Sequence, residues 1–130
     1  MNVTTVGGDP VSPVGLGTWR LTGASCRRSV ETALELGYRH VDTAQEYDNE
    51  RQVGDAIRNS EVDRDDIFLT TKLGKGNRGH DAVHRSIEES LAKLGTDHVD
   101  LPLIHWPNLI TPLGGTLSAM NDLVESGAVR

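Results

Sequence analysis

The sequence predicts an α/β fold, because four short apolar segments alternate with four segments of helical periodicity along its 130 residues. This alternation requires parallel strands joined by right-handed crossovers. Asp42, Lys72 and His105 each fall on the last residue of a predicted strand. Reactive groups gather at the carboxyl ends of strands in a (β/α)8 barrel, which four units would half complete, but they do so in a doubly wound sheet as well. The placement favours a barrel and leaves the second architecture open.

The first two strand-helix units occupy the first half of the chain. The first strand is predicted over residues 14–18, and the first helix is predicted to begin at a Ser25 cap and to end before Gly37. The second strand is predicted over residues 39–42 and the second helix over residues 49–59. The apolar positions that recur on one face of these helices are Cys26, Val30, Ala33, Leu34, Val53, Ala56 and Ile57.

The third and fourth units repeat this pattern. The strands are predicted over residues 67–72 and 99–105. A helix is predicted to begin at an Asp81 cap and to end at Gly95, and the last helix is predicted to begin at a Thr116 cap. The apolar faces consist of Val83, Ile87, Leu91 and Leu94 in one helix and Leu117, Met120, Leu123 and Val124 in the other.

Composition excludes several classes of function. The net charge of −6, from 19 acidic and 13 basic residues, argues against binding to nucleic acid or to an anionic membrane. The single cysteine cannot form an intramolecular disulfide, and no stretch has the pattern of a signal peptide or the length of a membrane span. We therefore expect a cytoplasmic chain with one partial domain over residues 1–130 and no internal boundary.

A glycine-rich segment, GKGNRG at residues 74–79, matches the G-x-G-x-x-G dinucleotide pattern between a strand and a helix. However, the preceding strand ends in the polar residues TTK, and no acidic residue ends the next strand, where a ribose hydroxyl would be held. We interpret the segment as a solvent loop.

Two histidines, His80 and His84, have a spacing similar to that of H-E-x-x-H zinc sites. His80 precedes the predicted Asp81 cap, so it is expected to lie outside the helix, and spacing indicates no third ligand. We therefore predict no metal site.

The most informative run is DTAQEYDNE, residues 42–50, which places an acid and a phenol where a strand passes into a helix. Asp42, Tyr47, Lys72 and His105 each have a structural explanation when taken singly. Together they combine a carboxylate, a phenol, an ammonium and an imidazole at the carboxyl ends of the predicted strands. A cation beside a phenol favours the phenolate, so this group predicts proton donation to a carbonyl that is being reduced.

Four segments around these residues resemble the aldo-keto reductases, in particular the 2,5-diketo-D-gluconate reductases: VGLGTW, ALELGYRHVDTAQEYDNERQVGDAI, FLTTKL and SLAKLGTDHVDLPLIHWP. The resemblance implies a (β/α)8 TIM-barrel fold, of which this chain would supply about the first four units as the N-terminal half. It also implies an NADP-dependent oxidoreductase that uses NADPH to reduce aldehydes or ketones.

The resemblance also assigns roles to individual residues. Tyr47 is expected to be the proton donor, Lys72 the cation beside it, Asp42 the partner of that lysine, and His105 the group that orients the carbonyl oxygen. Thr18, Trp19 and Asp42 are expected to approach the cofactor. Trp19, Tyr47, His105 and Trp106 are expected to border a small-molecule carbonyl substrate.

Other hypotheses remain beside this one. A non-catalytic half-barrel would associate through its open strand edges, with itself or with a complementary C-terminal half. A Schiff-base aldolase would use Lys72 as its nucleophile. We also expect the isolated chain to bind NADPH weakly, and we expect Pro102 to bulge or shift the last strand, because proline removes a ladder donor.

Overall fold

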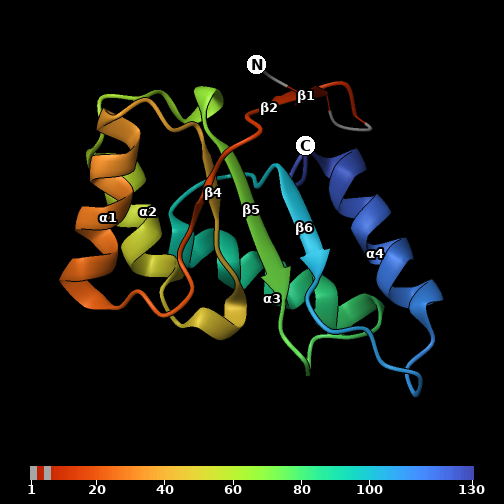
Figure 1. Ribbon diagram of the computed structural model, residues 1–130. Helices are drawn as coiled ribbons and strands as arrows, with labels where there is room; N and C mark the ends of the chain where they lie inside the picture. The colour runs from red at the N-terminus through yellow and green to blue at the C-terminus, as the bar shows by residue number, and fades with distance from the viewer. Residues whose placement is uncertain (1–2, 5–6) are drawn as a thin grey trace.

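The computed structural model describes residues 3–4 and 7–130 of the chain. It contains a four-stranded parallel sheet in the order β3 (Leu16–Gly17), β4 (His40–Asp42), β5 (Phe68–Leu73) and β6 (Leu101–Ile104). The helices that follow these strands are α1 (Gly23–Glu35), α2 (Glu50–Asn59), α3 (His80–Leu94) and α4 (Leu113–Ser126) (Figure 1). The remaining elements are a hairpin of β1 (Val3–Thr4) with β2 (Pro10–Val11) and two 3-10 turns, η1 (Gln45–Tyr47) and η2 (Arg64–Asp66).

The strand order follows the chain order without reversal, which confirms the predicted parallel β/α architecture. Each helix packs against the next helix in sequence, so the helices form a layer that begins at α1 and ends at α4 (Figure 1). A doubly wound sheet would instead reverse its strand order at a switch point. Within the described residues, no helix has the length and apolar character needed to cross a membrane.

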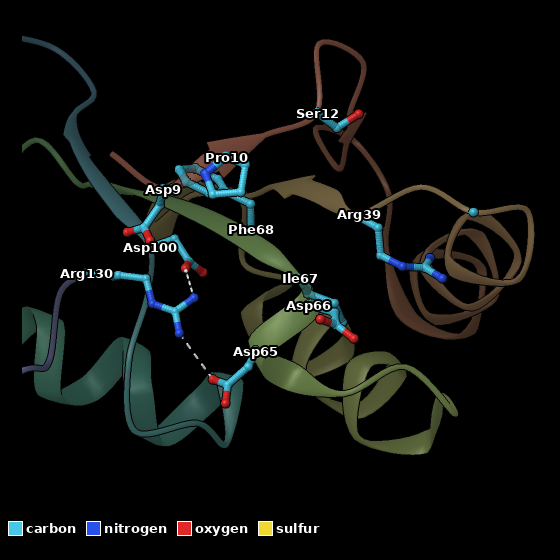
Figure 2. Close-up of a pocket in the computed structure, with 11 residues that line it drawn as sticks. Asp9, Pro10, Ser12, Arg39, Asp65, Asp66, Ile67, Phe68, Asp100 and Arg130 are labelled. Atoms are coloured by element: carbon cyan, nitrogen blue, oxygen red, sulfur yellow. Dashed lines mark hydrogen bonds and ion pairs between the residues drawn. The ribbon is translucent and has the colours of Figure 1, made fainter. Parts of the chain in front are cut away.

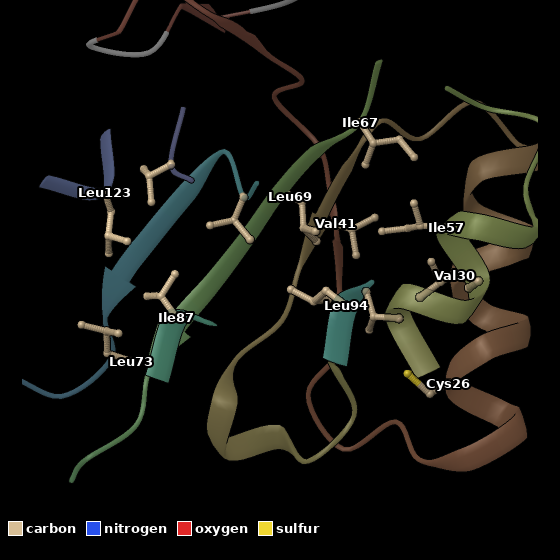
Figure 3. Packing of buried hydrophobic residues seen from close by; sticks show 14 of the residues in the cluster. Cys26, Val30, Val41, Ile57, Ile67, Leu69, Leu73, Ile87, Leu94 and Leu123 are labelled. Atoms are coloured by element: carbon tan, nitrogen blue, oxygen red, sulfur yellow. The ribbon is translucent and has the colours of Figure 1, made fainter. Parts of the chain in front are cut away.

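The core lies between the sheet and the helix layer (Figure 3). Val41 pairs in register with Leu69, and both strand residues are fully buried. Because side chains alternate along a strand, the neighbours Asp42, Thr70 and Lys72 face the other side of the sheet. The helices cover the first face with Cys26, Val30, Leu34, Val53, Ile57, Ile87, Leu94 and Leu123. This alternation sends apolar residues into the core and leaves the opposite face for polar chemistry.

Three helices begin earlier than the sequence predicts. The cap of α1 is Thr22 in place of Ser25, α3 begins at His80 after Gly79, and α4 begins at Leu113. His80 is therefore inside its helix, contrary to expectation. Thr116, the predicted cap, lies within α4, where its hydroxyl accepts a hydrogen bond from the Gly79 N–H at 3.0 Å. The partner of this threonine is the cap residue of α3, and local spacing does not reveal that contact.

The prediction that Pro102 bulges or shifts the last strand is wrong. The register runs unbroken from Thr70↔Leu101 through Thr71↔Pro102 to Leu73↔Ile104. Proline lacks one backbone N–H donor, but its neighbours on both sides pair regularly with β5. His105 therefore follows directly at the carboxyl end of β6.

Candidate active site

Lys72 is the centre of a polar cluster at the carboxyl end of the sheet. Its Nζ lies 2.5 Å from Asp42 Oδ1, 3.0 Å from the Thr43 carbonyl oxygen and 3.2 Å from the Tyr47 hydroxyl. The three protons of an ammonium group can supply these three bonds. The lysine side chain is largely buried, with 14% of its surface exposed, so the ion pair with Asp42 lies in a partly desolvated setting.

The strands bring the acid and the lysine together, because Asp42 ends β4 and Lys72 lies near the end of the adjacent strand β5. Tyr47 reaches the same place on the turn η1 that follows β4. Gln45 ties this turn to the neighbouring unit: its amide oxygen accepts from the Gly74 N–H at 2.7 Å, and its amide nitrogen donates to Ser90 Oγ at 3.0 Å. The phenol therefore has a defined position although it belongs to a connecting segment.

His105 completes the cluster from the end of β6. Its ring meets the Tyr47 ring edge to face, with centroids 5.6 Å apart, and stacks on Trp106 at 5.5 Å. Its Nδ1 lies 3.3 Å from Glu46 Oε2 but has no hydrogen bond within the described part of the chain. The structure thus brings together all four residues that the sequence singles out, from three different β/α units.

The predicted cofactor and substrate residues lie at the same edge. Thr18 is buried, and both its N–H and its hydroxyl donate to the Asp42 carbonyl oxygen at 3.0 Å. Trp19 and Trp106 are 63% and 56% exposed, an unusual state for so large an apolar surface. Beside Trp19, a Cβ added to Gly17 would meet no atom within 4 Å. Trp106, which stacks on His105, and the open backbone of Gly17, which pairs with Asp42, therefore adjoin the polar cluster, while the Arg20 guanidinium lies 4.4 Å from the centroid of the Trp19 ring.

Sequence reasoning missed two residues that shape this edge. Asn49 is buried; it accepts from the Thr43 hydroxyl at 2.8 Å and donates to the Thr18 carbonyl oxygen at 2.8 Å, joining the segments that follow β3 and β4. Glu46 places a carboxylate beside His105. Both stand in the DTAQEYDNE run, but spacing alone does not distinguish a side chain that bonds across the fold from one that faces solvent.

Adjacent to the cluster, Glu50 is buried at the start of α2, where its carboxylate accepts from the hydroxyls of Thr71 at 2.9 Å and Ser90 at 3.3 Å. Burial raises the pKa of this carboxyl, and the two hydroxyl bonds partly oppose that rise. The glutamate joins α2, β5 and α3 behind the strand that carries Lys72.

Residues 74–79 form a connecting segment between β5 and α3, in which Lys75 and Gly76 are exposed and Gly74 is buried. A cavity of about 410 Å³ opens at the other end of the sheet (Figure 2). It is bordered by Arg39, Ile67 and Asp100, which stand at or just before the starts of β4, β5 and β6, together with Arg130. The side chain of Asp100 accepts hydrogen bonds from Arg64 at 3.0 Å and from the Leu69 N–H at 2.8 Å. This carboxylate therefore has a structural role at the amino end of the sheet.

A parallel sheet whose strand order follows the chain without reversal, with polar side chains at the strand carboxyl ends, is typical of the α/β-barrel class. Residues 13–130 match the family model described as the aldo/keto reductase family. The chain therefore belongs to the aldo/keto reductase family.

Relatives and solved structures agree with this membership. The chain is 47% identical over 105 residues to an aldo-keto reductase of Mycolicibacterium smegmatis, covering 81% of this chain and 38% of that protein. It is 56% identical over 94 residues to the methylglyoxal reductase DkgB of Salmonella typhi, covering 72% of this chain and 35% of that protein. The chain thus spans less than half the length of these relatives.

Among solved structures, an aldo/keto reductase from Brucella melitensis matches with a TM-score of 0.94 and 41% identity over 99% of this chain and 50% of the other. A structure provisionally assigned as 2,5-diketo-D-gluconic acid reductase B matches with a TM-score of 0.94 and 47% identity, over 100% of this chain and 46% of the other. A Bombyx mori aldo-keto reductase in complex with NADP matches with a TM-score of 0.88 and 37% identity, over 100% of this chain and 48% of the other.

Proposed function

We propose that this chain forms the proton-donating N-terminal half of an NADPH-dependent aldo-keto reductase that converts aldehydes or ketones to alcohols. The observation that carries the proposal is the position of Lys72 Nζ, which bonds to both Asp42 and the Tyr47 hydroxyl. This arrangement couples a phenol to an ion pair at the end of a parallel sheet. Membership of the family supports the same chemistry.

Tyr47 acts as the general acid. Its hydroxyl oxygen accepts a hydrogen bond from Lys72, so its own proton remains to be donated to a substrate oxygen. When that proton leaves, the adjacent ammonium stabilises the phenolate, and Asp42 holds the ammonium in place. His105, packed against the Tyr47 ring, stands where it can donate to the carbonyl oxygen and stabilise the developing negative charge.

The nicotinamide cofactor supplies the hydride when it is bound. The open backbone at Gly17, which pairs in register with Asp42, supports a planar ring beside the Asp42–Lys72 pair, and Trp19 follows two residues later with 63% of its surface exposed. We assign Thr18, Trp19 and Asp42 to this side of the site. Trp19, Tyr47, His105 and Trp106 border the carbonyl compound, for which methylglyoxal, named in the DkgB relatives, is a first substrate to assay.

The geometry does not favour a Schiff-base aldolase. A lysine nucleophile must present an unprotonated nitrogen to the substrate. Here the nitrogen of Lys72 is committed as a donor to Asp42, to the Thr43 carbonyl and to Tyr47.

The test uses Tyr47→Phe, which removes the acid and keeps the ring. NADPH oxidation with methylglyoxal is followed in the 130-residue chain and in a chimera in which these residues replace the matching segment of DkgB. In the chimera we expect Tyr47→Phe to lower kcat at least about 100-fold, the contribution that a general acid commonly makes. NADPH binding, measured by quenching of tryptophan fluorescence, should change less than about twofold.

The matched control is Tyr38→Phe, which removes a hydroxyl from a partly exposed tyrosine just before β4, at the opposite end of the sheet. This control should keep full activity. Retention of most activity in the Tyr47→Phe chimera would remove Tyr47 from the role of proton donor, and a chimera that binds NADPH but reduces no carbonyl compound would contradict the proposed function.

A further inference from the structure

Two helices of the outer layer bring three metal-ligand side chains together, away from the cluster around Lys72. His80 and His84 lie one turn apart at the start of α3, and Asp122 lies on α4. His80 Nε2 is 2.7 Å and His84 Nε2 is 3.3 Å from the same oxygen, Asp122 Oδ2. Asp122 is the third group that the spacing of the histidines does not reveal.

The separations suit a single small cation. The ligand atoms of the three side chains lie within 4.8 Å of one another. Zinc binds imidazole nitrogen and carboxylate oxygen at about 2.0–2.2 Å, so donors around a tetrahedral ion stand about 3.4 Å apart. The distance of 3.3 Å from His84 Nε2 to Asp122 Oδ2 is close to this value, and the distance of 2.7 Å from His80 Nε2 to the same oxygen would have to lengthen. The two rings lie close together, with centroids 4.7 Å apart.

The surroundings of His80 supply the outer partner that metal-bound histidines use. Its Nδ1 lies 3.1 Å from Asp81 Oδ1 while its Nε2 faces Asp122. A proton on Nδ1 that is donated to Asp81 leaves Nε2 with a free lone pair, which is the tautomer that a metal requires. A cation between that lone pair and the Asp122 carboxylate would then satisfy both groups.

The cluster is also accessible to solvent. The side chains of His80, His84 and Asp122 are 47%, 31% and 44% exposed. An ion can therefore enter without any opening of the core, and water can occupy a fourth position. Two imidazoles with one carboxylate favour zinc and its transition-metal neighbours over magnesium or calcium, which prefer oxygen ligands alone.

We propose that His80, His84 and Asp122 form a binding site for one divalent transition-metal ion of the zinc type, which bridges α3 and α4. The ion would reinforce an existing contact between these helices, the hydrogen bond that the Gly79 N–H at the start of α3 donates to the Thr116 hydroxyl of α4. Its role is to join two neighbouring helices of the outer layer. The site is independent of the carbonyl chemistry proposed above.

The experiment titrates the chelator-treated 130-residue chain with Zn²⁺ by calorimetry and with Co²⁺ by visible absorption, at about pH 7.5. We expect one ion per chain with a dissociation constant at or below about 10 μM, Co²⁺ d–d bands of low-symmetry N,N,O coordination, and a melting temperature that rises with Zn²⁺ but not with Mg²⁺. The variants are His84→Gln and Asp122→Asn, each of which should weaken Zn²⁺ binding at least about tenfold.

The matched control is Glu125→Gln, which removes a carboxylate from the same helix outside the cluster, where Glu125 bonds to Asn121. The control should bind Zn²⁺ as the parent chain does. Stoichiometric binding that survives both cluster variants, or the absence of binding by a chain whose circular dichroism shows it to be folded, would overturn the proposal. A melting temperature that depends on the histidines but not on Zn²⁺ would do the same, because it would show that the three groups form only an imidazolium–carboxylate cluster.

Discussion

At the scale of single residues, the two carboxylates of the candidate active site have different partners. Asp42 forms an ion pair with Lys72, whereas Glu46 lies beside His105 and accepts a hydrogen bond from the backbone N–H of Lys75 at 3.3 Å. Glu46 therefore adds negative charge on the side where we propose that His105 and Trp106 border the substrate. The negative charge of Glu46 would disfavour a substrate carboxylate held close to it, and it opposes the positive charge of Lys75, whose Nζ lies 5.8 Å from the centroid of the Trp106 ring.

We predict that Glu46→Gln, in the chimera with DkgB, raises kcat/KM for anionic carbonyl substrates about threefold to tenfold and leaves that for methylglyoxal nearly unchanged. A unit charge a few ångströms away in a partly exposed site contributes about 1 kcal/mol, which corresponds to this range. The control is Asp48→Asn, which removes a charge from an exposed position two residues away, where the left-handed backbone tolerates asparagine. Equal gains for both substrate classes would contradict the specificity role of Glu46.

At the scale of elements, one close helix contact sets the packing of the outer layer. A Cβ at Gly54, in the middle of α2, would lie 2.2 Å from the Leu94 carbonyl oxygen at the end of α3. No side chain fits between these backbones, so glycine allows α2 and α3 to approach. α3 contacts β5, the strand that carries Lys72, and Ile57 of α2 and Leu94 of α3 belong to the same hydrophobic core as the β5 residues.

We predict that Gly54→Ala lowers the free energy of unfolding by about 1–3 kcal/mol, the cost of overpacking, although alanine is the better helix former. The matched control is Gly114→Ala in the first turn of α4, where an added Cβ meets no atom within 4 Å. That variant should be neutral or stabilising by up to about 1 kcal/mol. Urea unfolding followed by circular dichroism measures the free energy of unfolding of both variants. Equal changes would contradict the steric role of Gly54 at the contact between α2 and α3.

At the scale of the whole molecule, the described sheet has two edges. Within the described residues, β3 and β6 each pair with one strand only, and just before β6 Val99 forms a parallel bridge with Val129. An apolar cavity of about 670 Å³ lies beside β6 and α4. Its apolar lining includes Leu101, Pro102, Leu117, Met120 and Val124. Unpaired strand edges beside apolar side chains are surfaces on which another chain can pair.

We predict that the purified 130-residue chain forms dimers or larger species whose proportion rises with concentration in sedimentation velocity. Replacing the exposed α4 residues in the double variant Leu117→Glu and Val124→Glu should shift the chain toward monomer. Leu36→Glu, at the end of α1, is more exposed but distant from this edge, and it should leave the distribution unchanged. A strictly monomeric and well-folded parent chain would argue against the open edge as an association surface.

The sequence by itself determined the order and type of the four β/α units and the membership of Asp42, Tyr47, Lys72 and His105 in one site. It could do so because strand and helix periodicities are local, and because parallel strands place their carboxyl ends at one edge. The first residues of α1, α3 and α4, the carboxylate of Glu46 beside His105 and the meeting of Asp122 with His80 and His84 were decided only by the tertiary structure. The contacts of Glu46 with His105 and of Asp122 with the two histidines, like the hydrogen bond from Gly79 at the start of α3 to Thr116, join residues distant in sequence. The geometry of packed helices and loops, which local patterns do not encode, determines those contacts.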